Sequence, residues 1–197
     1  MQFKHKFDDT ILREYDIRGI VNQTLNELDS YMLGYFFGIT IKRKIKINSP
    51  KIVVSRDGRL TSSSLIKKLV EGLLMSGAKV TDIGLNPTPV LYFGNEALKV
   101  DGAIQVTGSH NPKNYNGFKM IALNKPFFGL DILKLSKFAE SGFDEVSSGE
   151  YKQTNLEDQY INKILTPIKN IKSHSLSNKN PLKKIIKELN KIVVNIV

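Results

Sequence analysis

Residues Thr107-Gly-Ser-His-Asn-Pro-Lys-Asn-Tyr-Asn-Gly-Phe-Lys-Met120 begin with a polar segment that lies between two apolar ones. The polar part is dense in glycine, asparagine and proline, which favour turns and left-handed backbone, so it is predicted to be a loop. Residues 103–106 lead into the loop and residues 118–122 lead out of it, and both read as apolar strands. A scaffold often presents a reactive side chain on such a loop. Ser109 is therefore the candidate reactive group.

The segments before this loop alternate between strand and helix. Strands are predicted at 51–55, 79–83 and 103–106, and helices at 26–44, from 62–64 to 76, and from 87 to about 98. This order is typical of an α/β domain with parallel strands. Residues 118–122 follow the third strand too closely for a helical crossover, so this strand is predicted to pair antiparallel at an edge. The expected fold class is therefore α/β, a three-layer domain with a mixed, mostly parallel sheet and one antiparallel edge strand.

Further along the chain, the patterns indicate where this domain ends. A helix is predicted at 130–139, followed by a linker at 147–149. A short amphipathic helix is expected at 156–165, ended by Pro167, and residues 182–197 read as a helix that runs into a short strand. We therefore expect one domain over residues 1–148, and a linker with the truncated start of a second domain over residues 149–197.

Two local patterns in the predicted helix 26–44 bear on its packing. Asn26 and Asp29 have the spacing of a helix-capping pair. Gly34 and Gly38 lie one turn apart and would let another element approach the helix closely.

Composition and charge narrow the function classes. The 197 residues include no cysteine, which excludes disulfides and thiolate chemistry, and no apolar run approaches the roughly 18 residues that span a bilayer. No membrane partner and a cytoplasmic location are expected. The net charge is +10, of which residues 152–197 carry +6 from nine lysines and three acids. This region has no arginine and a single aromatic residue, Tyr160, so nucleic acid is not an expected partner.

Charged turns supply further candidates. Residues 56–59 and 107–115 both follow predicted parallel strands, at the edge of the sheet where α/β domains bind ligands. Residues 13–19 read either as a surface turn with an ion pair or as an anion-contacting loop, in which Arg18 is the natural phosphate partner. His110 reads either as a hydrogen-bonding loop residue or as an acid–base group.

Four ordered blocks resemble one protein family: Arg13-Glu-Tyr-Asp-Ile-Arg-Gly19, Arg56-Asp-Gly-Arg59, Pro87-Thr-Pro89, and Thr107-Gly-Ser-His-Asn-Pro112 with Asn116-Gly-Phe-Lys119. They are similar to the N-terminal domain of the α-D-phosphohexomutases, the phosphomannomutase/phosphoglucomutase family. The resemblance covers about residues 10–165. It implies an isomerase that interconverts hexose 1-phosphate and hexose 6-phosphate through a phosphoserine and a bisphosphate intermediate.

The resemblance also implies roles for individual residues. Ser109 would be the phosphoserine and, through its phosphate, a ligand of Mg²⁺, while hexose 1,6-bisphosphate would serve as activator. His110 and Lys119 would take part in catalysis, and Tyr15 and Arg18 would contact phosphate or substrate. The remaining candidates would support the loop: Arg56, Asp57, Arg59 and Asn111.

The chain departs from the family pattern after its first domain. The family's Asp-x-Asp-x-Asp metal loop, its Gly-Glu-Met-Ser-Gly sugar loop and its final phosphate-binding loop have no counterpart in the 197 residues. We therefore expect negligible mutase activity from this chain alone. It reads as an enzyme part that works with a complementary chain or, alternatively, as a non-catalytic remnant that at most binds phosphosugar.

Overall fold

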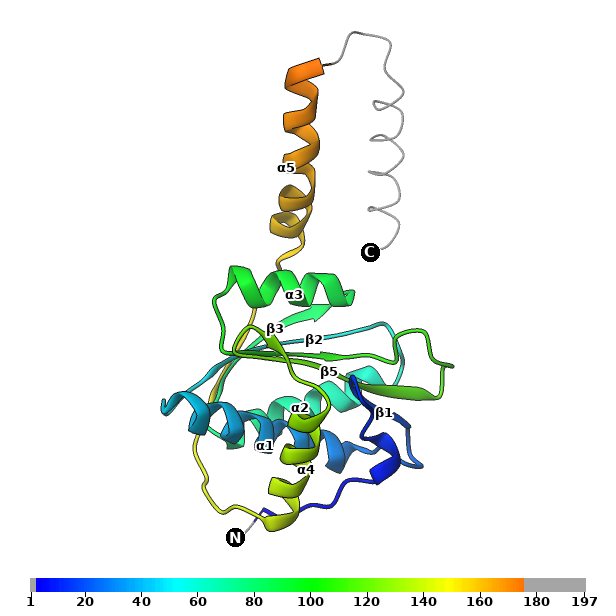
Figure 1. Ribbon diagram of the computed structural model, residues 1–197, viewed down its shortest axis with the longest axis vertical. Helices are drawn as coiled ribbons and strands as arrows, with labels where there is room; N and C mark the ends of the chain where they lie inside the picture. The colour runs from blue at the N-terminus through cyan, green and yellow to red at the C-terminus, as the bar shows by residue number, and fades with distance from the viewer. Residues whose placement is uncertain (1–2, 176–197) are drawn as a thin grey trace. The chain divides into compact units, whose positions relative to one another are not determined.

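The computed structural model describes residues 3–175 (Figure 1). The chain divides into two compact units, Met1–Leu156 and Glu157–Val197. In chain order the elements are a 3-10 helix Asp9–Ile11, β1 (Ile17–Ile20), α1 (Glu27–Ile45), β2 (Lys51–Arg56), α2 (Ser62–Met75), β3 (Lys79–Leu85), α3 (Thr88–Ala97), β4 (Gly102–Val106), β5 (Tyr115–Ala122), β6 (Lys125–Pro126), α4 (Leu130–Ser141), β7 (Glu150–Gln153) and α5 (Glu157–Ser175).

The first unit is built on one mixed sheet with the strand order β1-β5-β4-β2-β3-β7, and β6 adds to β5. Strands β4, β2, β3 and β7 run parallel to one another, and β5 is antiparallel to β4. The predicted α/β class with a mostly parallel sheet is confirmed. Strand β7 belongs to this sheet although it follows the predicted linker.

The antiparallel strand is not at the edge of the sheet, which corrects the prediction. Strand β1 pairs antiparallel with the outer side of β5 and forms that edge itself. Strand β1 has only four residues and its first three are buried, so it lacks the alternation of polar and apolar side chains that marks a half-exposed strand. Arg18 lies within it, and its charge makes the segment read as a surface turn.

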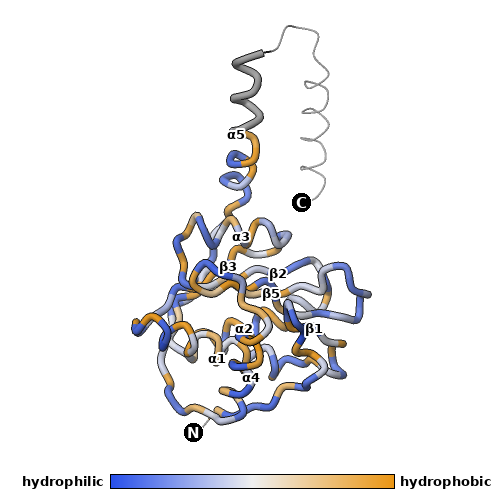
Figure 2. Tube along the Cα trace, viewed as in Figure 1, coloured by the Kyte–Doolittle hydropathy of each residue, from blue (hydrophilic) through white to orange (hydrophobic). Residues whose placement is uncertain are grey.

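Helices cover both faces of the sheet, which gives the three predicted layers. Helix α3 lies on one face, and α1, α2 and α4 lie on the other (Figure 1). Alternate residues of β2 separate the two cores, because Ile52 and Val54 belong to the large core on the α1 side while Val53 approaches Gly94 of α3. Figure 2 shows hydrophobic residues along the strands and helices of this unit and hydrophilic residues on the loops.

The predicted capping pair begins α1. The side chain of Asn26 accepts hydrogen bonds from the backbone N–H groups of Leu28 and Asp29, and the Asp29 carboxylate accepts from Asn26 N. Both partners of this capping box satisfy backbone donors that the first helical turn leaves free.

Helices α1 and α2 are in backbone contact at glycines. A Cβ on Gly34 of α1 would lie 2.2 Å from the carbonyl oxygen of Leu69, and one on Gly72 of α2 would lie 1.9 Å from the carbonyl oxygen of Tyr31. The expected close approach at Gly34 is thus confirmed, with α2 as the partner. Side chains any larger than hydrogen would push the two helices apart.

In the second unit, α5 continues past Pro167 to Ser175, which corrects the predicted end of this helix. An internal proline removes one backbone hydrogen bond and disfavours a helix without forbidding it. No helix among residues 3–175 has the length and apolar character needed to cross a membrane. The elements predicted for 182–197 lie outside the described residues.

The glycine contact predicts the effect of adding one methyl group. Gly34→Ala should lower the free energy of unfolding by about 2 kcal/mol, because overpacking against a backbone carbonyl costs more than the helix propensity of alanine returns. Urea denaturation measures the change. The control is Gly58→Ala, since nothing lies within 4 Å of a Cβ at this position, and it should change stability by less than about 0.5 kcal/mol. Unchanged stability of Gly34→Ala would contradict the packing described.

Candidate functional site

The Ser109 loop leaves the C-terminal end of β4 beside the turn that follows β2. Arg56 at the end of β2 pairs with Val106 at the end of β4, and Asp57 N donates to Val106 O at 2.9 Å. The two candidate loops therefore lie side by side at the same edge of the sheet, as the sequence predicted for parallel strands.

Ser109 has a left-handed backbone, with φ 51°. A residue with a Cβ adopts this conformation at a cost on the order of 1 kcal/mol, so the surrounding structure must hold it. Its N–H donates to Thr107 Oγ1 at 2.8 Å, and its exposed Oγ lies 3.3 Å from Nδ1 of His110. The loop thus presents one hydroxyl to solvent with an imidazole nitrogen beside it.

The guanidinium of Arg59 holds the loop from within. It donates to four carbonyl oxygens, those of Pro112 at 2.7 Å, Tyr115 at 3.1 Å, Ser109 at 2.9 Å and Asn111 at 2.7 Å. An arginine carries five N–H donors in a fixed planar arrangement, so these bonds fix the positions of the carbonyls relative to one another. The loop-support role predicted for Arg59 has this network as its physical basis.

The Arg59 guanidinium packs directly against Gly108. A Cβ at Gly108 would lie 2.1 Å from both Cζ and Nε of the Arg59 guanidinium. Gly108 also donates its N–H to Asp57 Oδ2 at 3.0 Å. The residue before Ser109 is therefore clamped between the guanidinium and the carboxylate of the β2 turn.

Asp57 is the central acceptor of this region. Its carboxylate accepts from Ser62 Oγ at 2.6 Å, Thr107 Oγ1 at 2.8 Å, Gly108 N at 3.0 Å and Arg59 N at 3.1 Å. Burial by itself would raise the pKa of Asp57, but these hydrogen bonds together hold the pKa below its ordinary value. A carboxylate that stays charged in a half-buried site must be paired this completely.

A second polar chain ties the far end of the loop to α2. The side-chain amide of Asn116, which is fully buried, donates to Thr61 Oγ1 and Ser62 Oγ at 2.9 Å each. Ser62 in turn donates to Asp57, so an unbroken series of hydrogen bonds links β5, α2 and the β2 turn. The sequence patterns place Asn116 in the block 116–119 and Ser62 at the start of a predicted helix. Neither residue is predicted there as part of the Ser109 site.

Three charged side chains meet next to the loop, from β1, from β5 and from the bend before β1. Arg18, which is 6% exposed, donates through Nη1 to Gly108 O and through Nη2 to the Asp16 carboxylate. Lys119 Nζ donates to the same carboxylate at 2.9 Å. The register that pairs Arg18 with Gly117 would, continued by two residues, place Asp16 opposite Lys119. Arg18 and Lys119 thus share one carboxylate.

Asp16 is a site residue that sequence reasoning missed. It lies two residues before Arg18, a spacing that puts both side chains on one face of a strand. The signal was hidden because residues 13–19 did not read as a strand. Recognising β1 would have placed Asp16 and Arg18 together.

The other predicted residues lie around the loop. Tyr15 is 70% exposed, and its ring centroid is 6.2 Å from that of Phe128. Asn111 Nδ2 donates to Gly108 O at 3.2 Å, inside the loop. The guanidinium of Arg56 is hydrogen-bonded at 3.5 Å to Asp57 O rather than to the loop.

The predicted Mg²⁺ finds few ligands in this unit. Magnesium takes oxygen ligands in an octahedral arrangement and usually binds through one or two carboxylates with phosphates and water. Residues 3–175 contain no group of three or more His, Cys, Asp and Glu side chains able to hold a metal ion. Nearby Asp57 and Asp16 already accept several hydrogen bonds within the protein. The described side chains therefore do not form a metal centre. The role of Ser109 as a Mg²⁺ ligand through its phosphate stays a prediction.

The depressed pKa of Asp57 predicts how stability depends on pH. Its contribution is fully present above the unfolded-state pKa of about 3.9 and is lost as pH falls through the lower folded-state pKa. Asp57→Asn should cost about 2 kcal/mol at pH 7, because the amide oxygen still accepts some of these bonds and the loss of one hydrogen bond to a charged group costs about 1.5–3 kcal/mol. Urea denaturation between pH 2 and pH 7 should show a smaller loss at low pH for the variant than for the parent chain.

The control for this prediction is Glu96→Gln, which removes one exposed carboxylate of α3. It should leave both the stability at pH 7 and the pH profile close to those of the parent. Equal effects of the two substitutions would show that the Asp57 hydrogen bonds do not stabilise the site.

Known proteins with similar sequences identify the family of this chain. A family model described as phosphoglucomutase/phosphomannomutase, alpha/beta/alpha domain I, matches residues 9–130. The chain is 38% identical over 156 residues to a phosphomannomutase/phosphoglucomutase of Pseudomonas syringae pv. tomato, covering 79% of this chain and 33% of that protein. It is 37% identical over 183 residues to a phosphomannomutase of Escherichia coli K12, covering 90% of this chain and 38% of that protein.

Structural similarity agrees with the sequence matches. The crystal structure of a phosphoglucomutase/phosphomannomutase family protein from Burkholderia thailandensis matches with a TM-score of 0.73 at 36% identity, covering 81% of this chain and 36% of that one. The chain spans about a third of the length of the curated relatives described above. Since the family model matches more than half of the chain, this protein belongs to the phosphoglucomutase/phosphomannomutase family and carries its α/β/α domain I.

Proposed function

We propose that this chain is the phosphoryl-carrier domain of a phosphohexomutase, with Ser109 as the carrier. The observation that carries the proposal is the exposed Ser109 hydroxyl on a loop whose backbone is fixed by Arg59 and Asp57. Phosphoryl transfer depends on positioning and on charge neutralisation more than on covalent chemistry by the protein. A rigid loop that presents one hydroxyl supplies the first of these.

Phosphoryl groups and protons both balance in the proposed transfer. In the forward step the bond between phosphorus and Ser109 Oγ breaks, and a bond forms between phosphorus and a hydroxyl oxygen of the hexose phosphate. The proton of that hydroxyl leaves to a base, and Ser109 Oγ takes up a proton. The bisphosphate formed then reorients, and its other phosphoryl group returns to Ser109 as the proton movements reverse. His110 Nδ1, at 3.3 Å from Ser109 Oγ, is the described group placed to hold a proton there.

Charge neutralisation comes from the strands beside the loop. A phosphate on Ser109 adds about two negative charges. Arg18 bonds to Gly108 O, directly before Ser109, and the Lys119 side chain is 28% exposed. Two cations share the single carboxylate of Asp16, which leaves one net positive charge in the cluster. We assign Arg18 and Lys119 to neutralising the phosphate, and Tyr15 to the substrate side of the site.

The proposal gives this chain only part of the mutase. Both ends of a hexose phosphate must be held for the bisphosphate to turn over. Residues 3–175 contain no group of three or more His, Cys, Asp and Glu side chains able to hold a metal ion. We therefore propose that hexose phosphate turnover, activation by hexose 1,6-bisphosphate and use of Mg²⁺ require a complementary chain with the family's other domains.

The chain alone should not interconvert hexose phosphates. Incubated with glucose 1-phosphate or mannose 1-phosphate, Mg²⁺ and the matching hexose 1,6-bisphosphate, it should give no hexose 6-phosphate above background in a coupled assay. The reason is that residues 3–175 form no metal centre to neutralise charge on the transferring phosphoryl group. Turnover close to that of a full-length relative under the same conditions would contradict the division of labour proposed.

A chimera with a full-length relative tests Ser109 as the phosphoryl carrier. A chimera with residues 1–156 in place of the matched segment of the Pseudomonas syringae relative should interconvert hexose phosphates. Ser109→Ala in this chimera should lower kcat by about a thousandfold or more, as expected when an essential nucleophile is lost. Ser63→Ala, which removes an exposed hydroxyl from α2, is the matched control and should have no effect. A folded but inactive chimera would instead support a non-catalytic remnant.

A further inference from the structure

Strand β7 ends the row of strands opposite β1, and all four of its residues are exposed. It pairs parallel with β3 on its inner side, and among residues 3–175 no strand pairs with its outer side. An uncovered edge presents free backbone donors and acceptors, which can pair with another strand. The proposed phosphoryl transfer uses none of these groups.

Two residues of β7 direct their backbone groups away from β3. Glu150 N donates to Ala78 O at 3.2 Å, and Thr154 N donates to the same side at 3.0 Å. Successive residues of a strand direct their N–H and C=O groups to alternate sides. Tyr151 and Gln153 therefore direct theirs to the open edge of the sheet.

The charges on β7 have opposite signs and lie two residues apart. Glu150 and Lys152 are on the same face of the strand, because side chains alternate between faces. Glu150 forms an ion pair of 2.7 Å with Lys79 of β3, and its side chain is still 71% exposed. Within residues 3–175 no ion pair is described for Lys152. Lysines on an edge strand commonly prevent pairing with other strands, but a glutamate opposite the lysine would remove this protection.

A second copy of β7, running antiparallel and centred on Tyr151, supplies that glutamate. In this register Tyr151 lies opposite Tyr151 of the second copy, and twofold symmetry places each Glu150 opposite the other copy's Lys152. Registers centred on Glu150 or Lys152 would place like charges opposite each other, which is destabilising. Charge complementarity therefore selects one register.

The backbone directions agree with the same register. Two residues that lie opposite each other in an antiparallel ladder exchange both backbone hydrogen bonds when both face the partner strand. The outward N–H and C=O groups of Tyr151 meet this condition. The flanking pairs of Glu150 with Lys152 are then of the kind without hydrogen bonds, in which side chains approach more closely. The Tyr151 side chain is 47% exposed, so the two rings can also contact each other across the joint.

We propose that the outer edge of β7 is a docking surface for a second copy of this chain, which pairs antiparallel about Tyr151 and joins two sheets into one. The loop that carries Ser109 leaves β4, and β2 and β3 lie between β4 and β7. The pairing therefore does not involve the residues of the Ser109 site, and it does not depend on the proposed carrier role.

Sedimentation equilibrium of the full 197-residue chain tests the association. A four-residue strand buries little surface, and small interfaces belong to weak complexes. We expect a monomer–dimer equilibrium with a dissociation constant of about 0.1–1 mM. A chain that stays monomeric at about 1 mM would overturn the proposal.

Charge exchange tests the register. Glu150→Lys and Lys152→Glu should each weaken dimerisation by about tenfold or more, because each puts like charges opposite each other twice. The double variant with both substitutions restores opposite charges, and its dissociation constant should lie within about threefold of the parent's. A mixture of the two single variants should form a mixed dimer, because two lysines then face two glutamates. Single variants that dimerise like the parent, or a mixture that does not associate, would refute the register.

The control for Lys152→Glu is Lys137→Glu, the same charge change at an exposed position of α4. It should not weaken dimerisation. The chain carries a net charge of +10, so either substitution lowers the general repulsion between copies. Weakening by Lys152→Glu would therefore have to come from the β7 edge, and equal weakening by Lys137→Glu would contradict this assignment.

Amide hydrogen exchange followed by NMR locates the contact in the backbone. Between about 50 μM and 1 mM protein, exchange at Tyr151 and Gln153 should slow by about twofold to fivefold as the dimer forms. The Thr154 amide already donates within the chain and should not change. Protection of Tyr151 and Gln153 that is independent of concentration would show that a segment of the same chain covers the edge, and would overturn the proposal.

Discussion

The carboxylate of Asp57 is the interaction on which the candidate site depends. It lies where β2 ends and accepts hydrogen bonds from α2, through Ser62, and from the loop after β4, through Thr107 and Gly108. A half-buried negative charge is costly unless its oxygen atoms are saturated with donors. Three segments far apart in the sequence are therefore drawn to one point, and Ser109 is presented from the loop that they hold.

Arg59 extends this arrangement from one charge to the whole loop. Its Nε lies 3.3 Å from Asp57 Oδ2, and its terminal nitrogens bind four loop carbonyls. Loops carry backbone groups that no regular ladder satisfies, so a guanidinium that satisfies several of them replaces secondary structure. Such a loop can keep Ser109 in a left-handed conformation without relying on contact with a ligand.

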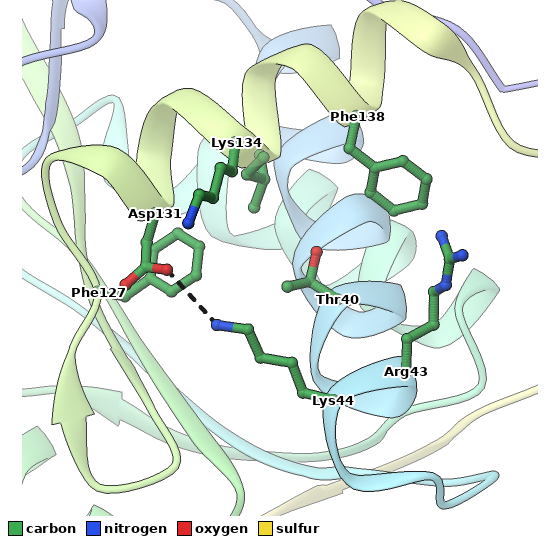
Figure 3. Close-up of a pocket in the computed structure, with 8 residues that line it drawn as sticks. Thr40, Arg43, Lys44, Phe127, Asp131, Lys134 and Phe138 are labelled. Atoms are coloured by element: carbon green, nitrogen blue, oxygen red, sulfur yellow. Dashed lines mark hydrogen bonds and ion pairs between the residues drawn. The ribbon is translucent and has the colours of Figure 1, made fainter.

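Positive charge is balanced differently beside Ser109 and between α1 and α4. Beside Ser109, the charge of Arg18 is largely buried and is balanced by Asp16, which it shares with Lys119. Between these helices, Arg43 of α1 and Lys134 of α4 (Figure 3) are exposed, and no carboxylate partner is described for them within residues 3–175. Burial makes an unpaired charge expensive, whereas solvent screens an exposed one. This difference explains why the first cluster has a counter-ion within the protein, whereas the exposed cations need none.

Local sequence patterns were sufficient to predict the alternation of strands and helices, the capping box at Asn26, the close approach at Gly34 and the loop that carries Ser109. These features depend on local periodicity, on turn formers and on backbone geometry, all of which are readable within a few residues. Strand β1 was not predicted because it is short and mostly buried. Without β1, the antiparallel strand β5 was expected to form the edge of the sheet. Asp16, which directly precedes β1, was therefore not predicted as a site residue.

The hydrogen-bond and ion-pair partners of these side chains follow from the three-dimensional fold. The acceptance by Asp57 of donors from Ser62 and Thr107, and the sharing of Asp16 by Arg18 and Lys119, depend on strand order and register. The pocket of about 240 Å³ between α1 and α4 likewise exists only where two helices distant in sequence meet (Figure 3). Hydrogen bonds and ion pairs act over a few ångströms in space, and sequence separation does not report that distance.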